Sequence, residues 1–152
     1  MRELNYSSPR TAFQGSEAAS AEPAFVLDAP DARFLTEVGM LAAGRGDMAR
    51  ADRIFTVLRR LRPDRAFPLL GLAVARLNAG RASEAVGLLR EVHLPDPDEQ
   101  AVVQSWCGLA LQLAGNFAQS RHVLLEAAQG SGEGAVLARQ MLGLAADGSE
   151  DA

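Results

Sequence analysis

Residues 32–63 read ARFLTEVGMLAAGRGDMARADRIFTVLRRLRP, and residues 66–97 read AFPLLGLAVARLNAGRASEAVGLLREVHLPDP. Aligned without a gap, the two stretches repeat a glycine, an alanine and a proline at a spacing of 34 residues: Gly46 and Gly80, Ala51 and Ala85, and Pro63 and Pro97. The bulky apolar Phe55 recurs in kind as Leu89. These are two copies of one unit, and a repeat of this length is typical of stacked helical hairpins.

Each repeated residue type has a physical role in such a hairpin. Glycine adopts the left-handed conformation that ends a helix, so we expect Gly46 and Gly80 in turns. Alanine lets two helices approach closely where they cross, and proline cannot continue a helix. The first unit therefore predicts a helix that follows an N-cap at Asp28 or Asp31, a turn, and a second helix capped by Asp47. The second hairpin is predicted from residue 66 to about residue 93.

A third helix pair follows, with more departures from the pattern. Its first helix is predicted over residues 102–113, its turn at residues 114–116 and its second helix over residues 117–127. Ser120 stands where alanine is expected, and Gly132 stands where proline is expected. Terminal repeats are often atypical, and we expect a last helix from Ala135 to about Ala146 to cover the open end.

The repeated unit resembles the tetratricopeptide family. In the first copy the matching residues are Val38, Gly39, Gly46, Ala51, Phe55 and Pro63, whereas Leu35 and Ala42 replace the usual aromatic residues. In the second copy Leu72, Gly80, Ala85, Leu89 and Pro97 match, and Ala73 replaces a glycine. The resemblance implies an all-α solenoid of about three antiparallel hairpins plus a C-terminal capping helix.

Composition divides the chain into three parts. Residues 1–30 are polar and rich in Ser, Ala, Glu and Pro, which predicts a flexible N-terminal arm. Residues 31–146 form the predicted helical domain, and residues 147–152 form an acidic tail. Two apolar islands in the arm, Phe13 and residues 25–27, leave open whether the arm docks on the domain.

Charge and cysteine content narrow the function classes. The formal net charge is −4, which argues against nucleic-acid binding, although all 15 cationic residues are arginines and seven of them lie within residues 45–65. The single cysteine, Cys107, allows no intramolecular disulfide and suits a reducing compartment. The chain shows neither a secretory signal nor an apolar run long enough to insert into a membrane, so we expect a cytoplasmic protein.

The tetratricopeptide resemblance also implies a binding surface, because in that family the first helices of successive hairpins line a concave groove. Carried over by position, the predicted partner-binding groove contains ten residues: Thr36, Met40, Phe67, Leu70, Val74, Leu77, Val102, Ser105, Leu109 and Leu113. This groove is mainly apolar, and the chain has no lysine for a carboxylate clamp. It suits a protein or peptide partner that presents an amphipathic helix or an extended apolar segment. Alternatively, some of these residues pack between hairpins, or the groove is covered in a homodimer.

Residues 31–145 look like the small chaperones of bacterial type III secretion systems, and the run at residues 65–80 looks like the central repeat of such proteins. This resemblance implies that the groove holds a secreted needle or translocator subunit. The alternative is a tetratricopeptide scaffold or regulatory adaptor in a secretion or other multiprotein assembly.

We expect no catalysis. His93, His122 and Cys107 form no local motif, and no metal-ligand spacing is present. The glycine-rich residues 130–134 lack the lysine and the preceding strand of a phosphate-binding loop. No metal site, cofactor or catalytic residue is therefore predicted.

Overall fold

The fold is taken from a computed structural model, which describes residues 27–144. Over this range the chain forms no strand and seven helices: α1 (Ala29–Gly44), α2 (Met48–Leu61), α3 (Phe67–Asn78), α4 (Ala82–Arg90), α5 (Pro97–Leu113), α6 (Phe117–Ala127) and α7 (Glu133–Met141). The prediction of an all-helical domain is confirmed for these residues. The predicted arm lies outside them as far as residue 26, and residues 29–30 belong to α1 instead. The predicted tail at residues 147–152 also lies outside the described range.

The turns and caps follow from single residues. Gly46, Gly80 and Gly115 have φ values of 75°, 74° and 81°, a left-handed conformation that other residues rarely adopt. They join α1 to α2, α3 to α4 and α5 to α6. The carboxylates of Asp28, Asp47 and Asp96 accept hydrogen bonds from backbone N–H groups at the starts of α1, α2 and α5, over 2.9, 3.1 and 2.8 Å. Each predicted turn therefore lies at its glycine, whereas α5 begins at Pro97, before the predicted start at residue 102, because Asp96 caps it there.

Helix α7 is shorter than the sequence predicts. It ends at Met141 because Gly143, with a φ of 70°, takes the left-handed conformation just beyond it. The N–H groups of Gly143 and Leu144 then donate to the carbonyls of Gln140 and Arg139 over 3.1 and 2.9 Å. These bonds satisfy the end of the helix and stop it before residue 146.

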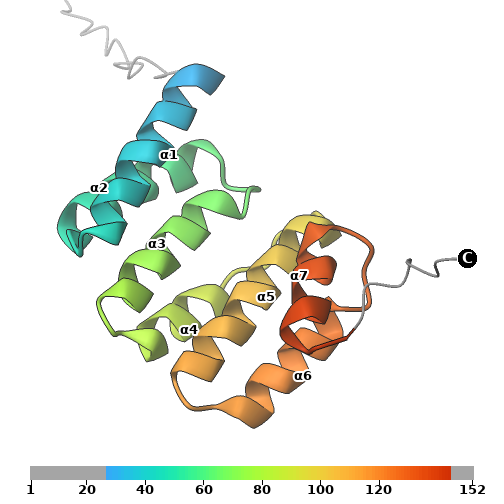
Figure 1. The fold of residues 1–152 in the computed structure, drawn as a ribbon. Coiled ribbons are helices and arrows are strands. Elements are labelled where there is room, and N and C mark those ends of the chain that lie inside the picture. The colour runs from blue at the N-terminus through green and yellow to red at the C-terminus, as the bar shows by residue number, and fades with distance from the viewer. Residues whose placement is uncertain (1–26, 145–152) are drawn as a thin grey trace, which may run out of the picture.

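Contacts between helices are restricted to near neighbours in the chain (Figure 1). Every helix packs on the next one, and α1, α3, α5 and α7 also pack on each other in succession. Among the described residues, the backbones of α2, α4 and α6 do not approach one another, although Arg90 of α4 donates to Gln119 of α6 over 2.8 Å. The odd-numbered helices therefore form one row, and the even-numbered helices pack mainly against that row.

Phe55 on α2 organises the junction of the first two hairpins. Its ring is fully buried, and both Gly39 on α1 and Gly71 on α3 lie against it. A Cβ atom added to Gly39 would come within 2.9 Å of the ring, and one added to Gly71 would come closer still. Because both glycines lack a side chain, α1 and α3 approach α2 closely on either side of this ring.

The third hairpin uses Ser120 in place of the expected alanine. Its hydroxyl is buried and donates to the carbonyl of Gly108 on α5 over 2.8 Å. Gly108 itself lies directly against Leu124 of α6, as Gly39 lies against Phe55. The serine therefore fits the same close helix crossing as alanine, and its extra polar atom is satisfied there.

The contact between α3 and α5 is much less extensive than that between α1 and α3. Trp106 on α5 stands 35 residues after Gly71, the same offset that separates Gly115 from Gly80, and packs on the core formed by α3, α4 and α5. A large ring thus occupies the position that glycine holds in the preceding hairpin. The N-terminal end of α5 is nevertheless tied to the α2–α3 connection, because Glu99 accepts from the N–H of Ala66 over 2.6 Å and pairs with Arg65 over 3.0 Å.

No helix in the described part of the chain combines the length and the apolar character needed to cross a bilayer.

Candidate partner-binding site

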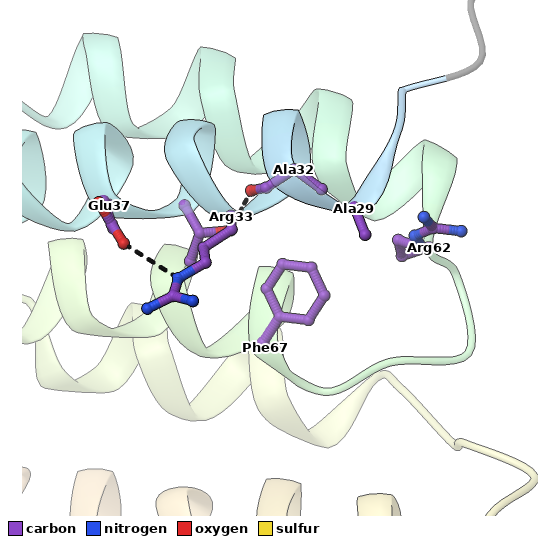
Figure 2. A pocket seen from close by; sticks show the side chains of 7 residues that line it. Ala29, Ala32, Arg33, Glu37, Arg62 and Phe67 are labelled. Atoms are coloured by element: carbon purple, nitrogen blue, oxygen red, sulfur yellow. Dashed lines mark hydrogen bonds and ion pairs between the residues drawn. The ribbon is translucent and has the colours of Figure 1, made fainter.

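A pocket of about 350 Å³ opens between α1 and the beginning of α3 (Figure 2). It is lined by residues of both helices and of the connection after α2: Ala29, Ala32, Arg33, Thr36, Glu37, Arg62 and Phe67. Figure 2 shows the ring of Phe67 in the space between the α1 side chains and Arg62. The pocket therefore lies on the row of odd-numbered helices, where the sequence predicts the groove.

The interior of this pocket is apolar although it contains a hydroxyl group. The Thr36 hydroxyl donates to the carbonyl of Ala32, one turn earlier on the same helix, over 2.7 Å. That bond occupies the only hydrogen of the hydroxyl group. With the ring of Phe67 and the methyl group of Ala32, Thr36 forms a surface that favours an apolar group.

Charged side chains surround this apolar surface. Nε of Arg33 lies 3.3 Å from Oε1 of Glu37, and both side chains are mostly exposed. Arg62 closes the opposite edge of the pocket and makes no ion pair among the described residues. The rim can thus contact polar groups that flank an apolar side chain, and exposed pairs of this kind contribute little to stability.

The ten predicted groove residues divide by their burial. Thr36 and Phe67 line the pocket, and Met40 and Leu113 are exposed on the same row of helices, by 41% and 62%. Five others are half-buried: Leu70, Val74, Leu77, Val102 and Leu109. Of these, all except Leu109 also pack against the hydrophobic core. Their contribution to packing between hairpins agrees with the alternative raised by the sequence.

The prediction that Ser105 faces the groove is wrong. Its side chain is completely buried, and its hydroxyl is directed at two backbone carbonyls, those of Ala101 at 2.9 Å and Gly134 at 2.7 Å. Gly134 belongs to α7, and the place of its missing side chain is filled by the backbone of α5 at residues 101–102. Helix α7 therefore covers this part of α5 and excludes a partner from Ser105.

A comparison of Ser105 on α5 with Thr36 on α1 explains why the pocket beside α1 is open. Thr36 follows Ala32 by four residues as Ser105 follows Ala101, and both hydroxyls bond to the carbonyl of that alanine. The Ser105 hydroxyl on α5 also lies within hydrogen-bond distance of a backbone carbonyl of α7, the next odd-numbered helix. The Thr36 hydroxyl on α1 has no second acceptor among the described residues. The space beside it is the open pocket.

Sequence reasoning missed the charged rim. Arg33 follows Ala32 by one residue, just as Phe67 follows Ala66, so the repeat register places both in equivalent positions. The repeat register therefore indicates that Arg33 borders the groove, but a search for apolar groove residues passes over it. Arg62 gave no such signal, because it lies in the connection after α2 and not on a first helix.

The described residues contain no group of three or more histidine, cysteine, aspartate or glutamate side chains that could hold a metal ion. His122 is exposed and lies 3.4 Å from Glu126. His93 and Cys107 both line a small cavity of about 140 Å³ between α4, α5 and α6, but no hydrogen bond joins them. Burial raises the pKa of the Cys107 thiol, and nearby Arg90 offsets part of this rise. A buried neutral thiol is a poor nucleophile, which favours a packing role for Cys107.

Comparisons of the chain with protein-family models, curated proteins and solved structures gave no match.

Proposed function

We propose that this protein is a protein–protein interaction module of the tetratricopeptide type, which binds an apolar segment of a partner along its odd-numbered helices. The repeated unit of 34 residues supports this fold assignment, as do the near-neighbour helix contacts and the three turn glycines. In such solenoids the first helices of the hairpins form the binding face.

The observation that carries the proposal is the open apolar pocket between α1 and α3. It is lined by Thr36 and Phe67 from two successive hairpins, so one bulky apolar side chain of a partner would contact both units. Met40 on α1 and Leu113 on α5 are further exposed apolar side chains on odd-numbered helices. An amphipathic helix or an extended segment with a spaced series of apolar side chains fits this arrangement.

Within this class we propose a cytoplasmic chaperone similar to those of bacterial type III secretion systems. The support is the resemblance of residues 31–145 to that family together with an apolar site that a partner would cover. A chaperone of this kind holds an apolar segment of a secreted subunit, which would otherwise associate with other copies of itself.

The proposal is tested by affinity capture of partners from the native lysate. The wild type is compared with two arginine variants, Thr36→Arg and Ser83→Arg. Thr36→Arg places a long cation in the pocket, beside Arg33 and Arg62. Ser83→Arg introduces the same side chain at an exposed position of α4 that lines none of the pockets described here. We expect a small secreted or membrane-active protein to bind the wild type and Ser83→Arg and to be lost from Thr36→Arg.

The captured protein is then produced alone and mixed with each variant, and light scattering reports its aggregation. A chaperone keeps the partner soluble, and Thr36→Arg does so less well although its circular dichroism is unchanged. Equal binding by both variants contradicts the pocket assignment. A stable folded partner that never aggregates contradicts the chaperone and favours the adaptor.

A further inference from the structure

A second cleft, of about 410 Å³, lies between the end of α2 and the segment that joins α4 to α5. It is lined by eight residues: Thr56, Arg59, Arg60, Pro63, Asp64, Val92, His93 and Leu94. No residue of α4 lines this cleft, so the space beside the last turn of α2 is left to the segment that follows α4. This cleft is distinct from the pocket beside α1, and none of its lining residues belongs to that pocket.

Two arginines and a histidine line this cleft without a side-chain partner in the described part of the chain. Arg59, Arg60 and His93 make neither an ion pair nor a side-chain hydrogen bond within residues 27–144. Other arginines close by are paired, such as Arg65 with Glu99 over 3.0 Å and Arg76 with Asp52 over 2.6 Å. Arg59 and Arg60 are therefore two consecutive arginines, both unpaired among the described residues, that line one cleft.

Partial burial makes the Arg59 donors more effective, whereas Arg60 and His93 are exposed. Arg59 is half-buried, so its guanidinium group is partly removed from water. Its attraction to an anion is therefore less screened than it would be at the open surface. Arginines in the last turn of a helix also favour the negative end of the helix dipole, which explains their position on α2. This interaction with the helix dipole forms no hydrogen bond, so the five N–H donors of each guanidinium remain available to an anionic ligand.

The remaining walls of the cleft limit what that ligand can be. Val92 and Leu94 are half-buried and, with Pro63, provide an apolar wall beside the cations. Asp64 contributes one carboxylate to the lining. The segment then continues into the acidic start of α5, at residues 96–99. A long polyanion such as nucleic acid would also meet the carboxylates at residues 96–99, whereas a single anionic group bound at Arg59 and Arg60 would face only the carboxylate of Asp64.

We propose that this cleft is a second docking site, which binds a short acidic peptide segment of a protein partner. A carboxylate side chain accepts hydrogen bonds from Arg59 and Arg60, and an adjacent apolar side chain packs on Val92 and Leu94. Bidentate pairing between guanidinium and carboxylate groups gives such a contact both strength and direction. The proposal is independent of the first pocket and of the chaperone assignment.

The test uses the full chain and three blocked pentapeptides, Ala-Leu-X-Leu-Ala, in which X is Glu, Gln or phosphoserine. Binding is followed by the NMR shifts of backbone amides and of arginine Nε–H groups. The variants are Arg60→Gln and its matched control Arg53→Gln. Arg53 is also exposed and unpaired on α2, but it does not line the cleft.

We expect the Glu peptide to cause saturable shifts at residues 59–64 and 92–94, and the Gln peptide to cause none. Loss of a charge-assisted hydrogen bond should weaken binding of the Glu peptide about tenfold in Arg60→Gln, with no change in Arg53→Gln. Equal binding of the Glu and Gln peptides, or equal weakening in both variants, overturns the proposal. Binding of the phosphoserine peptide alone overturns the carboxylate assignment, and a deoxythymidine oligonucleotide that produces the same shifts overturns the peptide assignment.

Discussion

Two glycine-to-alanine substitutions in helices should change stability in opposite directions. Gly71 on α3 is buried against the ring of Phe55, and a Cβ atom there would lie closer to three ring atoms than such atoms ever come in proteins. Gly87 on α4 is exposed, and a Cβ atom there would have no neighbour within 4 Å. The same chemical change therefore tests packing at one site and helix propensity at the other.

The magnitudes follow from these surroundings. Alanine favours a helix over glycine by about 1 kcal/mol, so Gly87→Ala should raise the free energy of unfolding by about 0.5–1 kcal/mol. Gly71→Ala gains the same propensity but overpacks a tight contact, which typically costs about 1–3 kcal/mol. Phe55 has little room to move aside, because its ring also lies against α1, where a Cβ atom added at Gly39 would already come within 2.9 Å. The upper part of the range therefore applies, and Gly71→Ala should lose about 2 kcal/mol net.

Urea unfolding followed by far-ultraviolet circular dichroism measures both changes, and equal slopes against denaturant show that the compactness of the two states is unchanged. Combining Gly71→Ala with Phe55→Leu should recover part of the loss, since leucine frees space at the contact. Their coupling should be at least about 0.5 kcal/mol, as for residues in direct contact. A stable or stabilised Gly71→Ala protein would refute the account of how α3 packs on α2.

Three further predictions concern single side chains. Ser120→Ala removes the 2.8 Å hydrogen bond to Gly108 and should cost about 0.5–1.5 kcal/mol in urea unfolding; no loss would mean that the hydroxyl contributes nothing there. Asp52→Asn breaks the bidentate pair with Arg76, at 2.6 and 3.2 Å, and should cost about 1 kcal/mol at low salt and less at high salt; a salt-independent loss would contradict an electrostatic origin. Because burial raises the pKa of the Cys107 thiol, the folded state keeps its proton longer than the unfolded state, so the free energy of unfolding should fall as pH rises above about 9. Urea titrations at successive pH values should show a smaller fall in Cys107→Ser; an equal fall would assign it to other groups.

The sequence was most informative where a residue acts through its own backbone or side chain. Gly46 and Gly80 are predictable because their turns need the left-handed conformation. Asp47 is predictable because a helix cap depends only on the helix that follows it. Phe55 and Ala51 were found because their spacing repeats in Leu89 and Ala85. Such features recur with the period of the unit, so the helix boundaries of the first four helices could be predicted closely.

The candidate site depended on contacts that the repeat does not encode. Ser105 occupies a groove position in the repeat, but α7 covers it because Gly134 allows the two backbones to approach. Arg62 reaches the pocket from a connection, whose path the periodic pattern does not specify. The cleft at Arg59 and Arg60 is lined by the end of α2 and by the segment after α4, and their relative position depends on how successive hairpins are oriented.

The restricted contact between α3 and α5 has a consequence for cooperativity. With Trp106 at that boundary, α5 packs more extensively on α4, which is only nine residues long, than on α3. Opening of α4 would therefore leave α1–α3 and α5–α7 linked only by the limited α3–α5 contact and by the Glu99 contacts at Ala66 and Arg65. The slowest amide hydrogen exchange within α1–α3 and within α5–α7 should then report separate free energies of opening.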